Sequence, residues 1–371
     1  MKSRANIQPD SAPHRPALFE AFPDLEGKLA WTHLDTSPSP VERMTGLGHD
    51  NLWIKRDDVV SSIYGGNKVR KLEFALADVI RRGKKNVFTM GGIGTNHGLA
   101  TAIYCNRLGL SSTILLYDQP VTSTVRKNLL LINKYATKTI YTKTHLNTGV
   151  QFYITRRLMN PGAYFLYPGG SNPVGTIGFV SAAFELKKQI DEGLMPEPKA
   201  VFCALGSKGT LSGLSLGLAL AGVKAKVIGV QVTMSHIGPV PIATQGTAGS
   251  LAHETHKLLM RLSPTVPKID VPLPAVVEGY LGDGYGFPTE KGMTASEKLK
   301  ACSACIALEP TYTAKTCAAF LDYAADPSHA GEPLLFWNTF NSRDFSAEIE
   351  ALNYRNLPSY YHPLFECETV A

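Results

Sequence analysis

The sequence predicts an α/β protein in which parallel sheets are covered by helices on both faces. Short runs rich in β-branched and aromatic residues recur along the chain, and most are apolar throughout, which is typical of strands buried on both faces. Longer segments with helical spacing lie between many of these runs. In one of them, Ile177, Val180 and Phe184 fall on one face before the segment stops at Gly193. Strands that alternate with helices in this way indicate the α/β class.

Seven runs are the expected strands, and one long stretch interrupts their spacing. Residues 233–275 are rich in Pro, Gly, Thr and His, which predicts a long excursion around a single helix at 250–262. No internal repeat and no low-complexity tract occurs. In chain order, the expected strands are 86–90, 112–117, 139–142, 163–167, 200–205, 226–232 and 333–338.

The composition is that of an ordinary soluble globular protein. The chain has 371 residues, of which 44% are hydrophobic and 18% charged, enough for a large core in one large domain or two intertwined ones. The net charge of +6 is spread along the sequence, and its densest basic cluster surrounds Gly83, where a helix is expected to end and cations are favourable. No nucleic-acid partner is therefore expected. No apolar segment has the length of a signal peptide or a membrane span, so no membrane association is expected either.

Cysteine usage predicts a reduced, cytoplasmic compartment. The six cysteines are scattered, mostly inside apolar segments, and a chain of this length needs no disulfides. Cys302 and Cys305 form a CxxC pair, but no second pair of Cys or His lies at the spacing of a zinc site. No metal is expected.

The stretch YGGNKVRKLEF places a lysine at the start of a helix. Gly65 and Gly66 permit a sharp turn and Asn67 can cap, so Lys68 is expected in the first helical turn. A cation there opposes the helix dipole. Two interpretations remain: a solvated basic helix start, or a lysine whose lowered pKa leaves its amine free to attack a carbonyl. Lys71 lies one turn later on the same face, where it can help hold an anion or form a surface ion pair.

Strand ends that run into glycine turns and helices are the places where open α/β sheets bind ligands. In FTMGGIGTNHG the glycines turn the backbone tightly, and Thr95, Asn96 and His97 then offer polar side chains and free amides at a helix start. Such a site suits a carboxylate. A plain loop with a capping Thr or Asn explains the same residues equally well.

The second glycine turn, in VFCALGSKGTLSG, suits a phosphate. Gly206, Ser207, Lys208, Gly209 and Thr210 follow a buried strand and open a helix, so successive amides form a concave anion nest to which the helix dipole adds. Neither the Walker A pattern nor GxGxxG is present, which argues against nucleotide hydrolysis and NAD chemistry.

A third region, around YGFPTE and EPTYT, carries Tyr285 and Tyr312 in turns. Tyrosines fixed in turns can exchange protons, yet most loop tyrosines only pack, so each alone is better explained as structural. The three regions together change this interpretation. A phosphate nest, a carboxylate nest and a nucleophilic lysine are what an enzyme needs to hold pyridoxal 5'-phosphate as a Schiff base and to bind a small amino acid on it.

The same residues resemble a known family. WIKRDD, GGNKVRKLEF, GGIGTNHG, GGSNPVGTIGF, LGSKGTLSG, YGFPTE and EPTYTAKT occur in the order seen in the D-cysteine desulfhydrase and 1-aminocyclopropane-1-carboxylate deaminase family, over nearly the whole chain. The resemblance implies fold type II of pyridoxal phosphate enzymes, the tryptophan-synthase-β-like fold, with two open, twisted parallel-sheet domains and the cofactor between them. It also implies a large domain of residues 1–70 and 181–371, a small domain of residues 71–180, and a homodimer.

The resemblance further implies a role for each motif residue. Lys68 would be the Schiff-base lysine, with Asn67 beside it in the cofactor site. Tyr285 and Tyr312 would lie near the reacting carbon and the leaving group, and Thr313 would face the pyridine nitrogen. The substrate carboxylate would lie at Thr95, Asn96 and His97, and the cofactor phosphate at Gly206, Ser207, Lys208, Gly209 and Thr210.

Thr313 separates the two branches of this family. The deaminases carry Glu there, and a carboxylate strengthens the electron sink of the ring more than a hydroxyl does. Elimination of a good leaving group needs less help than opening a carbon ring, and His97 also resembles the desulfhydrases. The expected reaction is therefore β-elimination, best matched by conversion of D-cysteine to pyruvate, sulfide and ammonia, with Lys68, Tyr285 and Tyr312 as the catalytic residues.

Several departures from the family pattern lie near the expected pocket. Thr95 stands where Ser is usual, Lys208 puts a charge into a loop of small residues, Ala314 replaces a glycine, and residues 338–341 replace a His-Thr-Gly-Gly stretch. They keep four alternatives open: deamination of the cyclopropane substrate, elimination from D-serine or another β-substituted alanine, a pyridoxal phosphate binder with little turnover, and a small-molecule-binding α/β protein without this cofactor. The cofactor follows more firmly than the substrate.

Overall fold

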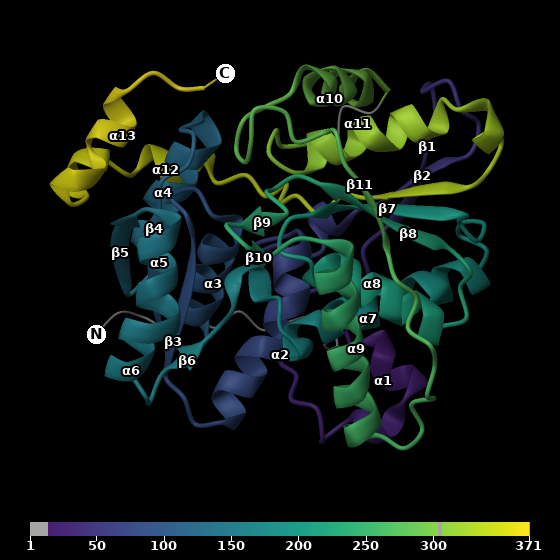
Figure 1. Cartoon of the computed structure of the whole chain (residues 1–371), viewed down its shortest axis with the longest axis horizontal. Helices are drawn as coiled ribbons and strands as arrows, with labels where there is room; N and C mark the ends of the chain where they lie inside the picture. The colour runs from purple at the N-terminus through teal and green to yellow at the C-terminus, as the bar shows by residue number, and fades with distance from the viewer. Residues whose placement is uncertain (1–13, 303–305, 371) are drawn as a thin grey trace.

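The computed structural model describes residues 14–302 and 306–370, which build two sheets side by side (Figure 1). The larger sheet is parallel except at one edge, where β1 pairs antiparallel with β2. Its strands, in spatial order, are β1 (Val41–Met44), β2 (Leu52–Lys55), β12 (Leu334–Trp337), β7 (Ala200–Leu205), β8 (Lys226–Gln231) and β11 (Ala275–Val277).

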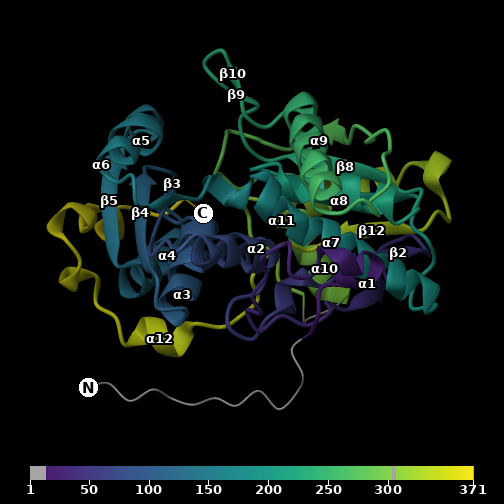
Figure 2. The ribbon, with the colours of Figure 1, turned by 90° about the horizontal axis from the view of Figure 1, so that it is seen from below.

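The smaller sheet is parallel throughout. All seven strands expected from the sequence are present in the two sheets. The missed strands are β1, β2 and β11, together with a two-stranded hairpin of β9 (His236–Ile237) and β10 (Val240–Pro241), which projects from the body in Figure 2. They are short, with at most four residues each, so their patterns are hard to recognise. The strands of the smaller sheet are β5 (Lys138–Lys143), β4 (Ser111–Tyr117), β3 (Asn86–Gly92) and β6 (Tyr164–Phe165).

Helices cover both faces of the larger sheet because its strands are apolar on both sides. Phe202 and Phe336 pack on one face against α10 (Glu290–Cys302) and α11 (Thr313–Ala324). Their chain neighbours Val201 and Leu335 point to the opposite face. That face is covered by α7 (Pro173–Asp191), α8 (Gly209–Leu220) and α9 (Gln245–Leu262), with α1 (Ala17–Ala21) packed on α7 (Figure 1).

The strands of the smaller sheet also bury apolar side chains on both faces. Val87 and Ile114 face α2 (Asn67–Arg81), α3 (Asn96–Arg107) and α4 (Ser123–Tyr135), while Phe88 and Leu115 face Phe152 on the other side. Around Phe152 lie two further short helices, α5 (His145–Val150) and α6 (Arg156–Met159). The expected helix-covered parallel sheets, and with them the α/β class, are confirmed.

The C-terminal segment returns to the smaller sheet. Its helices are α12 (Ser346–Glu350) and α13 (Pro363–Glu366), and the guanidinium of Arg126 on α4 donates to the Leu364 carbonyl over 2.9 Å. Tyr361 is buried there, with its ring centroid 5.3 Å from that of Tyr141 on β5. The expected domain boundary near residue 70 falls inside α2, and the one near residue 180 falls inside α7. These two helices join the two sheets, and the domain boundaries stay a prediction.

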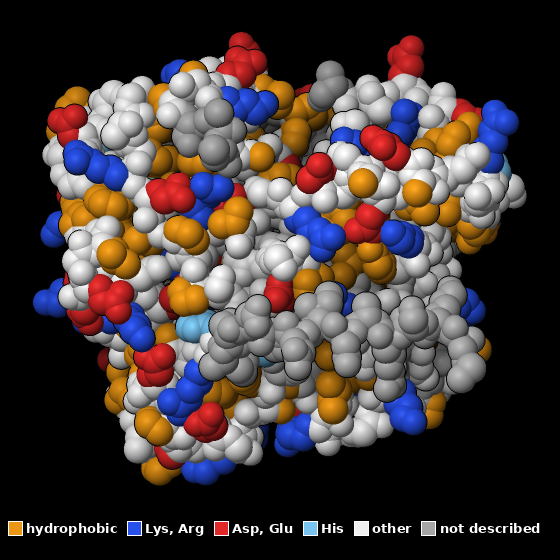
Figure 3. All heavy atoms as spheres, turned by 180° about the vertical axis from the view of Figure 1, so that it is seen from behind, with side chains coloured by type: hydrophobic (Ala, Val, Ile, Leu, Met, Phe, Trp, Pro, Cys, Tyr) orange, Lys and Arg blue, Asp and Glu red, His pale blue; other side chains and the backbone are white. Residues whose placement is uncertain are grey.

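The face of the molecule shown in Figure 3 carries both signs of charge. In the face shown in Figure 3, lysine and arginine side chains alternate with aspartate and glutamate, and neither sign forms a large continuous field. Among the described residues, no helix combines the length and the apolar character that crossing a membrane requires.

Candidate active site

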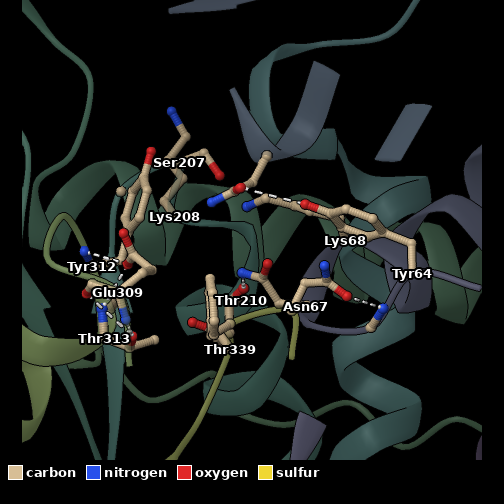
Figure 4. Close-up of a pocket in the computed structure, with 16 residues that line it drawn as sticks. Tyr64, Asn67, Lys68, Ser207, Lys208, Thr210, Glu309, Tyr312, Thr313 and Thr339 are labelled. Atoms are coloured by element: carbon tan, nitrogen blue, oxygen red, sulfur yellow. Dashed lines mark hydrogen bonds between the residues drawn. The ribbon is translucent and has the colours of Figure 1, made fainter. Parts of the chain in front are cut away.

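A cavity open to solvent lies where the carboxyl ends of strands from both sheets meet (Figure 4). Segments that follow β3, β7 and β12 reach it, together with the starts of α2 and α11. Ligands in open α/β sheets bind at such ends. Nine of the residues expected from the sequence line it: Asn67, Lys68, Asn96, Gly206, Ser207, Lys208, Thr210, Tyr312 and Thr313.

The two glycines before Lys68 allow a close approach of three backbone segments. A Cβ on Gly65 would lie 2.2 Å from the Asp58 carbonyl oxygen, and one on Gly66 would lie 2.5 Å from that of Phe340. Gly66 also has φ +79°, which favours glycine. Its N–H donates to the Asp57 carbonyl over 2.7 Å. The turn that presents Lys68 is therefore fixed by backbone contacts.

Buried charges behind this turn hold it in place. Arg70, one turn along α2, pairs with Asp57 at 2.8 Å and with Glu185 of α7 at 2.9 Å. Lys55 at the end of β2 pairs with the same Glu185 at 2.6 Å, and the Trp337 indole donates to Asp57 over 2.7 Å. Burial acts to raise the pKa of Glu185, but the charges of Arg70 and Lys55 outweigh it and hold that pKa well below its usual range.

Lys68 enters the cavity with no hydrogen bond or ion pair to the described residues. Burial lowers the pKa of its amine to about 8, while the negative charge of Glu309 acts to raise it. In Figure 4, Lys68 and Glu309 come from opposite sides of the cavity, from α2 and from the segment before α11. A partly buried amine with this pKa is available both as a nucleophile and as a base near neutral pH.

The glycine turn after β7 forms the N-terminus of α8. Lys208 caps this helix with φ +61°, an unusual conformation for a residue with a side chain, and its ammonium donates to the Ile242 carbonyl over 3.3 Å. Thr210 accepts from the Asn67 amide over 3.1 Å, which ties this loop to the Lys68 turn. The free N–H groups of the first turn and the helix dipole favour an anion here.

Lys71 supplies a cation at the same place. A Cβ on Gly209 would lie 3.0 Å from the Lys71 amine, so this amine lies against the start of α8. Lys71 is 1% exposed, and among the described residues its contacts are the Gly169 carbonyl at 3.2 Å and the Phe179 ring, with no carboxylate. Burial and the charge of Lys68 lower its pKa well below the usual range. A buried ammonium without an anionic partner, beside a helix N-terminus, fits a phosphate.

The start of α3 forms a second place for an anion. Asn96 accepts hydrogen bonds on its side-chain oxygen from Asn128 over 2.9 Å and from Tyr64 over 3.4 Å. The amide nitrogen of Asn96 therefore remains as a donor at the cavity. In the described part of the chain, no hydrogen bond uses the backbone N–H groups of Asn96 and His97. This arrangement suits a carboxylate.

Four expected site residues do not line the cavity: Thr95, His97, Gly209 and Tyr285. The Thr95 hydroxyl caps α3 by accepting from the Gly98 N–H over 3.1 Å. His97 is 4% exposed, and neither ring nitrogen has a partner among the described residues. Burial, then the charges of Lys68 and Lys71, lower its pKa well below the usual range. The roles expected for these residues in substrate binding stay predictions.

Tyr285 reaches the site through Tyr312. The hydroxyl oxygens of Tyr285 and Tyr312 are 2.5 Å apart, and Tyr312 lines the cavity. Burial raises the pKa of Tyr312 well above its usual range, and burial likewise raises that of Tyr285. Both phenols therefore carry their protons near neutral pH, and the pair holds a proton that a leaving group can take.

Glu309 is a cavity residue that the sequence motifs did not predict. This carboxylate accepts from the N–H groups of Tyr312 at 2.6 Å, Thr313 at 2.9 Å and Thr311 at 2.9 Å, so it caps α11. Burial raises its pKa, and these hydrogen bonds act in the opposite direction. The signal was present in EPTYT, since an acidic residue just before a helix start is a capping pattern.

The fold and the site define a pyridoxal phosphate enzyme of fold type II, with a tryptophan-synthase-β-like arrangement. The family described as pyridoxal-phosphate dependent enzyme matches residues 33–339, and the chain belongs to it. Its cofactor is pyridoxal 5'-phosphate. The amine of Lys68, the start of α8 and the unpaired Lys71 fit the aldehyde and the phosphate of this group.

Individual relatives confirm the resemblance found in the motifs. The chain is 33% identical to D-cysteine desulfhydrase of Klebsiella pneumoniae over 86% of this chain and 94% of that protein. It is 32% identical to D-cysteine desulfhydrase of Salmonella paratyphi A over the same shares. The crystal structure of an ACC deaminase homologue matches with a TM-score of 0.74 at 26% identity, covering 92% of this chain and 100% of that one.

Proposed function

We propose that this enzyme catalyses β-elimination from a small amino acid, with D-cysteine as the substrate and pyruvate, sulfide and ammonia as the products. The observation that carries the proposal is the partly buried Lys68 amine facing a pair of protonated tyrosines across one cavity. The D-cysteine desulfhydrases of Klebsiella and Salmonella, similar over most of the chain, support the choice of substrate.

The residues around the cavity divide between the cofactor and the substrate. Lys68 would bind the cofactor aldehyde covalently, and Lys71 with residues 206–210 would hold its phosphate. Thr313 and Asn67 would flank the ring. When bound, pyridoxal phosphate supplies a ring that accepts the electron pair released at the substrate Cα. Asn96 and the free N–H groups at the start of α3 would hold the substrate carboxylate.

Two proton movements then complete the elimination. The substrate amine would first displace Lys68 from the cofactor aldehyde. The freed Lys68 amine would then take the proton from Cα, a task that suits a base with a pKa near neutral pH. The Cβ–S bond breaks, and the hydroxyl of Tyr312 gives its proton to the departing sulfur while Tyr285 holds that hydroxyl by their hydrogen bond. The sulfur leaves readily because a thiolate is a stable anion, so the weak acidity of these phenols suffices. Once released, the remaining enamine would add water and lose ammonia, which gives pyruvate.

A second candidate keeps the cofactor and changes the reaction to deamination of the cyclopropane amino acid. The likeness to an ACC deaminase homologue favours it, and so does Glu309, which puts a carboxylate at the cavity beside Thr313. All three N–H donors at the start of α11 engage Glu309, however, so its oxygens are already bound. For this reason we prefer the elimination.

The test is a substrate panel assayed for keto-acid release. It contains both enantiomers of cysteine and serine and the cyclopropane acid, and Lys68→Ala should abolish all turnover. Lys188→Ala, which removes an exposed lysine paired with Glu20, is the matched control and should act as wild type. Product from D-cysteine supports the proposal. Product confined to the cyclopropane acid refutes it, and a cofactor absorbance band without any product indicates a binder.

We also infer a cytoplasmic homodimer. All five cysteines among the described residues are free, as suits a reducing compartment. Large apolar side chains are exposed on one segment of the smaller domain, where Leu146, Leu158 and Met159 are 76%, 77% and 67% exposed. Light scattering of the purified protein gives the oligomeric state directly, and a monomer at micromolar concentration would refute the dimer.

A further inference from the structure

The loop that carries Tyr285 has little backbone structure of its own. Four glycines within residues 279–286 adopt positive φ, at +93°, +65°, +139° and +89° in chain order. All residues from 279 to 288 are described, and none of them takes part in a backbone–backbone hydrogen bond outside helices and strands. Glycines in such conformations lose much conformational entropy when they are fixed. Something else must therefore hold Tyr285 in position.

Side chains from one helix perform this task. Asp322 near the end of α11 accepts from the Tyr280 hydroxyl over 2.8 Å, and Tyr312 at its N-terminus contacts the Tyr285 hydroxyl. Between them, the Lys315 ammonium donates to the carbonyls of Leu281 at 2.7 Å and Gly284 at 3.2 Å. Residues 312, 315 and 322 fall within one face of a helix with 3.6 residues per turn. The loop lies along that face.

Lys315 is the tie nearest to Tyr285. The Gly284 carbonyl belongs to the peptide bond that leads into Tyr285, so the ammonium fixes the backbone at this residue. Lys315 is 0% exposed and makes no ion pair within the described part of the chain. Burial lowers its pKa to about 8, and the nearby charges of Glu309 and Asp283 act to raise it. Burying an ammonium costs free energy, and the hydrogen bonds to two carbonyls of one loop offset that cost here. The same two hydrogen bonds anchor the loop.

We propose that Lys315 is a positioning residue that holds the Tyr285 hydroxyl against Tyr312 through the loop of residues 279–288. The effect on catalysis expected from this anchor rests on the proposed function, whereas the anchoring itself does not. Without Lys315, the four glycines let the loop move and the contact between the two phenols lengthens, so the Tyr312 hydroxyl is no longer held at the leaving group. Cofactor binding depends on other segments and is retained.

A double-mutant cycle on the cofactor-loaded enzyme tests the proposal. Lys315→Met keeps the length of the side chain and removes the donor, and it should lower kcat about tenfold with little change in KM. In the Tyr285→Phe background, the same change should lower kcat less than about twofold, because the hydroxyl that Lys315 positions is already absent. Lys187→Met, which removes a half-buried lysine paired with the exposed Asp191, serves as the control.

Limited proteolysis gives a second readout that does not depend on the substrate. Chymotrypsin should cut the loop of residues 279–288 faster in Lys315→Met than in wild type, while Lys187→Met is cut at the wild-type rate. Equal losses of kcat in both backgrounds, or an unchanged rate of cleavage in the loop, would overturn the proposal. Faster cleavage with unchanged kcat would show that the loop does not position Tyr285 and would overturn it too. Should the methionine variant fail to fold, Lys315→Gln replaces it with the same expectations at smaller amplitude. A wild type that is inactive on the whole panel refutes the proposed function alone, and the proteolysis experiment still tests whether Lys315 anchors the loop.

Discussion

The turn before Lys68 and the loop around Tyr285 both present a functional side chain, yet they are built differently. The turn is clamped by the backbone of residues 57–58 and 339–340 and by buried ion pairs. The loop of residues 279–288 is held by three side chains of α11. The turn that would bind the cofactor is therefore held rigidly by backbone contacts. The loop that would face the leaving group depends on side-chain contacts and can change its conformation more easily. Changes in substrate are expected to arise in the loop and not in the turn.

Breaking the clamp should have the largest effect on stability. Arg70→Met leaves the carboxylates of Asp57 and Glu185 buried with one partner fewer, which costs about 3–5 kcal/mol of the free energy of unfolding. Urea denaturation followed by circular dichroism measures this change. Lys188→Met breaks an exposed pair with Glu20 and should cost about 0–1 kcal/mol. A loss for Arg70→Met no larger than this control would show that the buried cluster does not hold the turn.

The same contrast explains what the sequence could predict. Lys68, its two glycines and the phosphate loop occur in contiguous motifs, because a turn and a helix start depend on neighbours in the chain. The partners of these residues could not be predicted in the same way. Asp57 and Glu185 are 128 residues apart, and only the fold brings both to Arg70.

The leaving-group side was harder still. Tyr285 and Tyr312 were noticed in their turns, but their roles came from the resemblance, since an isolated loop tyrosine is better explained as structural. Lys315 was missed because a lysine in an apolar helix gives no hint of which carbonyls it will meet. The seven expected strands were predicted correctly because their runs are rich in β-branched and aromatic residues, whereas β1 and β11 are short edge strands whose formation depends on their neighbours.

A middle-sized effect is expected where the two regions face each other, at Glu309. Its charge raises the pKa of Lys68, so Glu309→Gln should lower that pKa below the wild-type value of about 8. The free amine is the reactive form, so wild-type attachment of pyridoxal phosphate to the apo protein should slow about tenfold per pH unit below the pKa. Borohydride trapping at Lys68, followed by mass spectrometry, measures the rate from pH 6 to 10.

The direction of the shift makes this test decisive. In Glu309→Gln the midpoint of the rate profile should move to lower pH, and attachment at pH 7 should become faster. Glu290→Gln, at the start of α10 and exposed, should leave the midpoint unchanged. A midpoint that stays in place or rises in Glu309→Gln would mean that this carboxylate carries no charge at the cavity.

The smallest effect is expected at Lys208, where a backbone conformation and a side-chain contact both shape the phosphate loop. Its φ of +61° strains the backbone by about 1 kcal/mol relative to glycine, whereas its ammonium makes a contact of 3.3 Å to Ile242 and lies in the phosphate loop. Lys208→Gly should therefore change the free energy of unfolding by less than about 1 kcal/mol and weaken pyridoxal phosphate binding about fivefold through the lost charge. An absorbance titration of the apo protein measures the affinity, and Lys208→Ala separates charge from backbone strain because it removes only the former. If alanine binds as wild type and glycine binds more weakly, the loop conformation decides the affinity, and the lysine charge contributes nothing to holding the phosphate.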